Sequence, residues 1–285
     1  MKVPFWKMHG AGNDFILLDR ITTDTPYPSP ATIQRWCQPH TGIGADGLIL
    51  VQPADTKEDH FRMVFFNPDG GEVGMCGNGA RCVARFAFEQ GIAPSNMRFA
   101  TSAGPIDAVV QDDTVTLNMQ IPESIQLDQT LKRGDQAILF DFANTGVPHA
   151  IVTCDDLTNI DLPTLGKAIR LHADFAPAGT NVDFIRILPD NTLEIRTYER
   201  GVEAETLACG TGVAAAAVTC VVKGRISSPV TVRTAGGDTL TITVTQHEKQ
   251  ITKLTLAGPA VHVFHGFVAL GPAPYPGDTH AHRNL

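Results

Sequence analysis

Two runs of small apolar residues stand out in a chain whose other apolar positions mostly alternate with polar ones. They cover residues 80–90 and 213–223, and their composition predicts two buried helices. Gly91 and Gly224 follow directly, in the position where glycine commonly ends a helix. A shorter helix is expected near residues 33–37. The pattern therefore predicts two long helices at equivalent places in the two halves of the chain.

Extended segments surround both predicted helices. In these segments apolar and polar residues alternate, or a short apolar run ends in a polar loop, as expected of strands. The predicted strands cover residues 61–66, 106–110, 115–119, 193–198, 239–244 and 251–256. Strand and helix do not alternate as in regular βαβ units, so the predicted fold class is α+β. Each half is expected to wrap mostly antiparallel strands around one central helix.

An internal repeat is the strongest feature of the sequence. The run Cys76-Gly77-Asn78-Gly79 recurs 133 positions later as Cys209-Gly210-Thr211-Gly212. Residues 12–16 also resemble residues 180–185, at an offset of 168 or 169. The repeat predicts two pseudo-symmetric domains that arose by internal duplication and face each other across an active-site cleft.

The predicted boundary between the two domains lies near residue 121. Residues 1–121 form the first half and residues 122–264 the second. A C-terminal segment of about residues 265–285 is expected to complete the first half. A chain of 285 residues is long enough for two such domains, each with its own core.

Cys76 and Cys209 each precede a predicted helix start. Backbone N–H groups in the first helical turn have no partner within the helix, and the helix dipole adds partial positive charge there. Such a position is expected to lower a cysteine pKa from about 8.5 toward roughly 3.5–7.5. The same amides suit a bound carboxylate, and the flanking glycines leave them accessible.

Two such cysteines on opposite sides of one bound amino acid predict a specific reaction. One thiolate removes the α-proton and the opposite thiol returns a proton to the other face, which inverts the carbon without a cofactor. A free cysteine is most often a core residue, but the matched glycine contexts favour chemistry for Cys76 and Cys209. The core interpretation is retained for Cys37, Cys82, Cys154 and Cys220.

Composition and charge narrow the range of partners. The chain has 22 basic and 30 acidic side chains, a formal charge of −8 and no basic cluster, which argues against nucleic acid and anionic membranes. The N-terminus lacks a signal-peptide pattern, and six cysteines are too sparse for a disulfide framework. No cysteine pair has the short spacing of a zinc site. These features predict a reduced, cytoplasmic protein that acts on a small molecule.

Several motifs together resemble the diaminopimelate epimerase family. The motifs are residues 8–15 (MHGAGNDF), 76–81 (CGNGAR), 198–201 (YERG), 208–212 (ACGTG) and 258–264 (GPAVHVF). The likeness extends over about residues 4–268. It implies a cofactor-independent isomerase that converts LL-diaminopimelate to the meso form, in the synthesis of lysine and peptidoglycan precursors. It also implies two pseudo-symmetric domains and a homodimer.

The resemblance also implies a role for each residue of the site. Cys76 and Cys209 are the catalytic acid/base pair, and His149 and Glu199 tune their pKa values. Glu199 also receives the α-ammonium group, and Arg200 binds the distal end of the substrate. The full implied substrate-binding set is Asn13, Asn67, Gly77, Asn78, Asn181, Glu199, Arg200, Gly210 and Thr211. No metal-binding residue is expected.

Three positions depart from the pattern of the family. Gly47 stands where some members carry a glutamine that lines the site, and Val147 where some carry an asparagine that contacts the distal end. Both changes remove a polar contact with the substrate. Phe264 stands where some members carry a tyrosine at the dimer interface, and it keeps the aromatic ring.

Other interpretations stay open on the sequence. Residues 42–47 match G-x-G-x-x-G, but a strand rather than a helix is predicted next, which argues against a dinucleotide site. A racemase or isomerase of another amino acid would use the same two cysteines. A cysteine hydrolase or transferase would pair one cysteine with His149 and leave the other without a role. A non-catalytic carboxylate-binding module would need neither sulfur.

Overall fold

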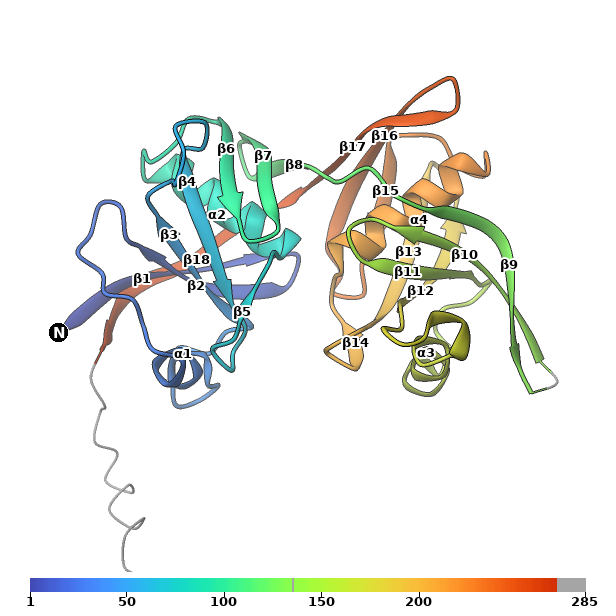
Figure 1. The fold of residues 1–285 in the computed structure, drawn as a ribbon, viewed down its shortest axis with the longest axis horizontal. Coiled ribbons are helices and arrows are strands. Elements are labelled where there is room, and N and C mark those ends of the chain that lie inside the picture. The colour runs from blue at the N-terminus through green and yellow to red at the C-terminus, as the bar shows by residue number, and fades with distance from the viewer. Residues whose placement is uncertain (135, 271–285) are drawn as a thin grey trace, which may run out of the picture.

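The two halves of the chain form two strand-rich bodies that lie side by side (Figure 1). The computed structural model describes residues 1–134 and 136–270. Each body has one helix at its centre, α2 (Gly77–Glu89) in the first and α4 (Gly210–Val222) in the second. The predicted α+β class, with one central helix in each of two similar halves, is therefore confirmed.

Strands of the first half curve around α2. Neighbouring strands are antiparallel except for two parallel pairs, β2 with β3 and β4 with β6. A short helix, α1 (Pro30–Cys37), packs on the outer face of the sheet. The strands are β1 (Lys2–Gly10), β2 (Asn13–Asp19), β3 (Gly47–Gln52), β4 (Phe61–Phe66), β5 (Glu72–Val73), β6 (Asn96–Thr101), β7 (Gly104–Gln111) and β8 (Thr114–Asn118).

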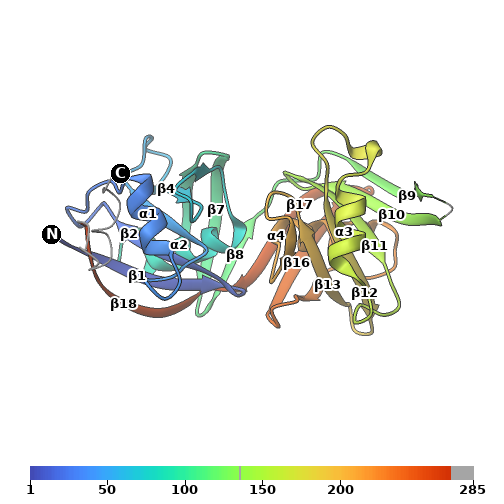
Figure 2. The same ribbon diagram turned by 90° about the horizontal axis from the view of Figure 1, so that it is seen from below.

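Strands of the second half surround α4 in the same way. The parallel pairs here are β11 with β12 and β13 with β15. Helix α3 (Leu162–Arg170) and the short 3-10 helix η1 (Ala173–Phe175) cover the outer face, on the same side of the molecule as α1 (Figure 2). The strands are β9 (Ile125–Arg133), β10 (Gln136–Asn144), β11 (Pro148–Thr153), β12 (Asn181–Leu188), β13 (Thr192–Glu199), β14 (Ala204–Thr206), β15 (Val230–Arg233), β16 (Thr239–His247) and β17 (Gln250–Pro259).

The order of elements repeats along the whole chain. The series β1-β2-α1-β3-β4-β5-α2-β6-β7-β8 matches β10-β11-α3-β12-β13-β14-α4-β15-β16-β17. The register of pairing repeats too, since Phe15 faces Gly47 in β2–β3 and His149 faces Asn181 in β11–β12. Both residues of the second pair lie 134 positions after their counterparts. The internal duplication therefore extends well beyond the cysteine motifs.

This register corrects one of the sequence predictions. The expected match of residues 12–16 with residues 180–185 is wrong, because β2 is equivalent to β11 and Asn181 begins the equivalent of β3. The two segments look alike because each is a polar strand start followed by apolar core residues. The offset near 133 holds instead throughout the chain.

Both central helices begin one turn earlier than predicted, because their first turns consist of glycines and polar residues that lack an apolar pattern. Their ends are as predicted. Gly91 and Gly224 adopt positive φ angles of 69° and 67°. The amide of Ile92 bonds to the Ala87 carbonyl at 2.8 Å, and α4 has the equivalent bond at 3.0 Å. These bonds close the last turn of each helix.

Two segments connect the halves, the chain after β8 and the continuous pair β17–β18 (Figure 1). Residues 255–259 of β17 pair with β8, and β18 (Val261–Ala269) pairs with β1 along its length. Pairing with the first half thus begins before the predicted boundary near residue 265. The rest of the expected C-terminal segment, from residue 271, lies outside the described residues.

Each half has two apolar layers, one on each face of its sheet. The inner layer packs against the central helix, and the outer layer against α1 or α3. In α4, residues 213–220 are buried on every side, which explains their almost continuous apolar sequence. Cys82 and Cys220 belong to the inner cores, as predicted. Among the described residues, no helix is long and apolar enough to cross a membrane.

Candidate active site

Cys76 and Cys209 occupy equivalent positions, directly before the first residue of α2 and of α4. Both have extended backbones, with φ and ψ of −137° and 121° for Cys76 and −117° and 106° for Cys209. Neither sulfur caps its own helix. Amides of the first helical turn can bind an anion, and those of Asn78, Gly79 and Gly212 also act on the adjacent sulfurs.

The two helix starts meet at the junction of the halves. Asn78, in the first turn of α2, donates from Nδ2 to the carbonyl of Ala208 at 3.2 Å, and Ala208 immediately precedes Cys209. The same amide donates to Oδ1 of Asn13. A Cβ atom added at Gly12 would lie 3.0 Å from Leu207 Cδ1, so the backbone of the first half packs closely against the second. The polar network thus connects both cysteine-bearing segments.

Burial dominates the ionisation of both cysteines. It raises the pKa of the Cys76 thiol, although the amides of Asn78 and Gly79 act to lower it. Burial raises the pKa of the Cys209 thiol as well, and the carboxylates of Glu199 and Asp183 add to this effect. The prediction that the helix starts lower both pKa values is therefore wrong. The amides act in the predicted direction, but desolvation of the thiolate outweighs them.

A buried polar chain connects an aspartate to the sulfur of Cys209. Asp183 Oδ2 lies 2.7 Å from His149 Nδ1, and Asp183 Oδ1 accepts from the hydroxyl of Thr197 at 2.7 Å. On the other side of the ring, His149 Nε2 lies 2.9 Å from Thr211 Oγ1. That hydroxyl is 3.4 Å from Cys209 Sγ. His149 and Asp183 are fully buried, whereas Thr211 is half-buried.

Neighbouring groups define which nitrogen of His149 carries the proton. Asn181 Oδ1 accepts from the Arg200 amide at 2.8 Å and its Nδ2 donates to the Pro148 carbonyl at 3.1 Å, which fixes the orientation of the side-chain amide. Nδ2 also lies 3.4 Å from His149 Nε2, so Nε2 faces a donor and accepts. Nδ1 therefore donates to Asp183. Nε2 can then accept the Thr211 hydroxyl hydrogen, which leaves the Thr211 oxygen to accept from Cys209.

Equivalent positions in the first half have no such chain. A Cβ atom added at Gly212 would lie 2.4 Å from Asp183 Oδ1 and 3.1 Å from His149 Cε1. A Cβ atom at the equivalent Gly79 would instead meet Ile49 and, farther away, Phe15. The two halves share one backbone arrangement but carry polar residues beneath one helix start and apolar residues beneath the other. Packing thus requires Gly212, because Asp183 is held in place by its hydrogen bonds, whereas at Gly79 only the end of the Ile49 side chain would have to move.

Replacing Gly212 by alanine is expected to destabilise the protein by about 1–3 kcal/mol, because the new methyl group would overlap Asp183 in a fully packed site. Thermal unfolding followed by circular dichroism would measure the change. Gly77→Ala is the matched control, since a Cβ atom there would meet nothing within 4 Å. Equal melting temperatures for the two variants would contradict the proposed steric role.

Three other predicted site residues, Glu199, Arg200 and Asn67, differ in their burial and in their hydrogen bonds. Glu199 ends β13 and is half-buried, and burial raises its pKa. Arg200 bonds through Nη1 to the Gly179 carbonyl at 3.3 Å. No described carboxylate lies within 4.0 Å of its guanidinium group. Asn67 lies in an exposed turn whose backbone closes on Gly71, and its side chain makes no hydrogen bond to a described residue.

Gly47 is the first residue of β3, and Val147 directly precedes β11. A Cβ atom at Gly47 would lie 2.5 Å from Phe65 Cε2 and 2.6 Å from the Phe66 carbonyl oxygen. The ring of Phe65 thus fills the space that a side chain at position 47 would need. Val147 lies in the loop before β11 and is half-buried.

The strand predicted after residue 47 is confirmed as β3, which argues against the interpretation of residues 42–47 as a dinucleotide-binding motif.

Sequence reasoning missed two buried residues of this site, Asp183 and Arg81. Asp183 follows Asn181 by two positions on β12, and strand alternation could have placed both on one face. Arg81 belongs to the motif of residues 76–81, but no role was predicted for its side chain. It is fully buried in α2 and bonds to the Asn78 side chain at 3.0 Å.

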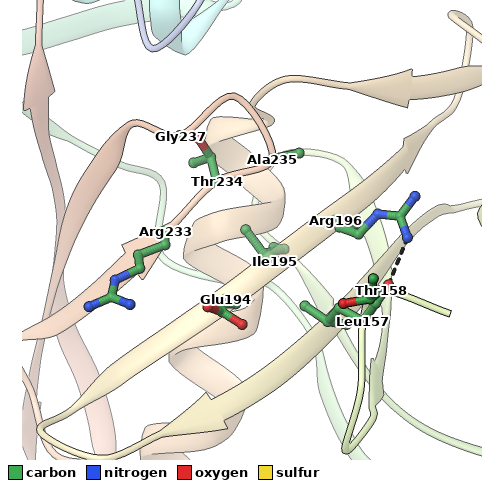
Figure 3. A pocket seen from close by; sticks show the side chains of 9 residues that line it. All are labelled: Leu157, Thr158, Glu194, Ile195, Arg196, Arg233, Thr234, Ala235 and Gly237. Atoms are coloured by element: carbon green, nitrogen blue, oxygen red, sulfur yellow. Dashed lines mark hydrogen bonds between the residues drawn. The ribbon is translucent and has the colours of Figure 1, made fainter. Parts of the chain in front are cut away.

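A hollow of about 530 Å³ lies in the second half (Figure 3). Its lining includes Glu194, Arg196 and Arg233 from β13 and β15, and none of the predicted site residues. Arg196 bonds there to the Leu157 carbonyl at 2.7 Å and pairs with Glu205. Within the described part of the chain, no group of three or more His, Cys, Asp or Glu residues is placed to hold a metal ion.

The duplicated fold is the one found in solved racemases and epimerases. The probable proline racemase from Agrobacterium radiobacter K84 is similar with a TM-score of 0.70 and 18% identity, over 95% of this chain and 94% of that chain. The hydroxyproline epimerase from Agrobacterium vitis is similar with a TM-score of 0.69 and 20% identity, over the same shares. At this identity the likeness establishes the fold alone.

The chain belongs to the diaminopimelate epimerase family, whose model matches residues 5–124 and 142–263. The diaminopimelate epimerase of Aquifex aeolicus (strain VF5) is 41% identical over 271 residues, which cover 92% of this chain and 96% of the relative. That of Acinetobacter baumannii is 37% identical over 280 residues, with coverage of 93% and 97%. The resemblance inferred from the motifs is thereby confirmed.

Proposed function

We propose that the protein converts LL-diaminopimelate to meso-diaminopimelate, with Cys76 and Cys209 as the acid/base pair and without a cofactor. The observation that carries the proposal is the equivalent placement of the two cysteines before two central helices, whose starts are joined by the Asn78–Ala208 hydrogen bond. Six free thiols fit a reducing compartment. We therefore place the reaction in the cytoplasm, in the synthesis of lysine and peptidoglycan precursors.

The proposed reaction moves one proton off the α-carbon and another one on. The α-carboxylate binds to the first-turn amides of Gly77, Asn78, Gly210 and Thr211, between the two helix starts. A thiolate on one side takes the α-proton, and the electron pair of the broken C–H bond stays on the α-carbon. The thiol on the other side then gives its proton to the opposite face. Each cysteine ends in the state that the other began in, and exchange with solvent resets the pair.

Charged residues at the end of β13 support recognition of an amino acid. Glu199 is half-buried and influences both cysteines, so it lies where an α-ammonium group would balance its charge. Arg200 offers a planar guanidinium group for a distal carboxylate. Asn181 acts through the protein, since its amide bonds to the Arg200 and Pro148 backbones and thereby orients the arginine segment. Asn13 contacts the pocket through Asn78, and Asn67 would act from its exposed turn after β4.

Proton NMR in deuterated water tests the proposal directly. Reduced protein is mixed with LL-diaminopimelate, and both the α-proton signal and the isomer ratio are followed. Loss of the α-proton signal together with growth of the meso isomer supports the proposed activity. Absence of exchange, with the thiols titrated as reduced, would contradict it. Other amino acids would then be tested as substrates, because Gly47 and Val147 both lack a polar side chain.

We also propose that the protein is a homodimer that assembles through β18. Val263, Phe264 and Phe267 are apolar and have exposed fractions of 53%, 46% and 71%. Such an apolar strand surface is normally covered by a partner. Light scattering after size exclusion is expected to give twice the chain mass of 30.6 kDa. Phe267→Asp is expected to give a monomer, whereas Leu139→Asp, on exposed β10 of the other half, should not. A monomeric wild-type protein would contradict the proposal.

A further inference from the structure

The guanidinium group of Arg81 is a buried positive charge without a nearby carboxylate. Arg81 lies in the second turn of α2 and is fully buried. No carboxylate of residues 1–134 or 136–270 lies within 4.0 Å of its nitrogens. Burying a cation is unfavourable unless hydrogen bonds and an opposite charge compensate it. The position of Arg81 therefore calls for an anion.

Three hydrogen bonds hold the guanidinium group in place. Nη1 donates to the Gly77 carbonyl at 3.3 Å, Nη2 to Asn78 Oδ1 at 3.0 Å, and Nε to the Pro259 carbonyl at 3.2 Å. The first two partners follow Cys76 directly, and the third belongs to the strand that returns from the second half. Because Arg81 occupies Oδ1 of Asn78, the Nδ2 of that amide faces Ala208. Arg81 thus orients the amide that joins the two cysteine segments.

Two glycines lie close to this side chain. A Cβ atom at Gly10 would lie 2.7 Å from the Asn78 carbonyl oxygen and 3.3 Å from Arg81 Nη2. One at Gly258 would lie 2.3 Å from Leu240 Cδ2 and 3.2 Å from Arg81 Nε. Gly10 and Gly258 come from two distant motifs, residues 8–15 and residues 258–264. Both motifs therefore approach the guanidinium group, and a larger residue at either glycine would also collide with Asn78 or Leu240.

Few groups near Arg81 can supply the negative charge. The groups that act on its ionisation are Cys82, Cys76 and Asp238. Burial in the inner core raises the pKa of Cys82 to about 12, so this cysteine stays a neutral thiol. Asp238 lies beyond ion-pair distance. Cys76 directly precedes the two residues that Arg81 binds. Burial raises the pKa of its thiol, and the charge of Arg81 acts against that rise.

The second half has no equivalent of this cation. Ala214 is the equivalent of Arg81 in the repeat, because it lies 133 positions later, as Cys209 does after Cys76. Ala214 is a small apolar residue buried in the core around α4. Around Cys209 the charged groups are the carboxylates of Asp183 and Glu199. The duplicated site is therefore chemically unequal, because Arg81 acts on Cys76 and Asp183 acts on Cys209, whereas Glu199 acts on both cysteines.

We propose that Arg81 is a positioning residue that stabilises the Cys76 thiolate through its buried charge and orients the Asn78 amide toward the Cys209 segment. The inference rests on the proposed function in that it takes Cys76 as an acid/base group. Arg81 itself acts through Cys76 and Asn78. The charge and the hydrogen bonds make separate contributions that different substitutions can distinguish.

Alkylation of individual cysteines as a function of pH tests this proposal without substrate. Iodoacetamide labelling of Cys76 and Cys209 is quantified by peptide mass spectrometry between pH 6 and 10. In Arg81→Met and Arg81→Gln, Cys76 should react about tenfold more slowly at a given pH below its pKa, because its thiolate loses the neighbouring charge. Arg81→Lys keeps the charge and should stay within about threefold of wild type.

Arg85 provides the matched control, because it lies one turn later on α2 and pairs with Glu89 and Asp113 at the surface. Arg85→Met should leave the Cys76 profile unchanged. Loosening of the fold would make both cysteines react faster, which is opposite to the expected slowing. An unchanged Cys76 profile in folded Arg81→Gln would overturn the proposal.

If Arg81→Met and Arg81→Gln fail to fold, Arg81→Lys still tests the role of the charge. A tenfold slower alkylation of Cys76 in Arg81→Lys would overturn that role, because lysine keeps the positive charge. Labelling needs no diaminopimelate. A failure of the NMR test therefore contradicts the proposed function alone, and a failure of the labelling test contradicts the role of Arg81 alone.

Discussion

Alanine in place of either Cys76 or Cys209 is expected to reduce net epimerisation by about a thousandfold. Each sulfur serves one face of the α-carbon, so neither can replace the other. The rate would be measured as growth of the meso isomer from LL-diaminopimelate. Exchange of the α-proton for deuterium, followed in the same samples, separates loss of proton removal from loss of proton return.

Each helix offers its own control for this experiment. Cys82 lies on α2 with Cys76, and Cys220 lies on α4 with Cys209, and both are buried in the cores. Cys82→Ala and Cys220→Ala should keep nearly the full rate at temperatures well below unfolding. A Cys76→Ala or Cys209→Ala variant that kept a tenth of the wild-type rate would show that its sulfur is not an essential acid or base.

Replacing Asp183 by asparagine is expected to reduce kcat by about a hundredfold with a smaller change in KM. Asparagine can present its amide to His149 Nδ1 in place of the carboxylate, which would reverse the roles of the two ring nitrogens. Nε2 would then no longer accept from Thr211, and the chain to Cys209 would be broken. Steady-state kinetics from pH 6 to 10 would measure the effect.

Thr211→Val breaks the same chain at its next member and should lower kcat to a similar extent. Asp141→Asn is the matched control, because Asp141 is another buried carboxylate of the second half and pairs with Lys223 at 2.9 Å. That variant is expected to lose stability and keep its kcat. An Asp183→Asn enzyme with wild-type kcat would contradict the role assigned to the chain.

Local sequence was sufficient to predict much of the fold. The central helices, their glycine ends and the strands around them depend on interactions between close neighbours in the chain. Their existence was therefore predictable, although the helix starts at Gly77 and Gly210 were not, because glycine has no apolar pattern. The order of strands in the sheets depends on contacts between distant segments. The match of residues 12–16 with residues 180–185 was predicted wrongly for this reason, since only the pairing of β11 with β12 shows the correct register.

The sequence by itself determined the duplication, the two cysteines before the helices and the family, because these are properties of motifs and their spacing. Only the tertiary structure decided the surroundings of each cysteine. Burial raises both thiol pKa values, whereas helix starts alone suggested the opposite. The structure also placed Asp183 and His149 beside Cys209 and Arg81 beside Cys76. Desolvation and charge depend on which distant segments pack together, and no local pattern of residues contains that information.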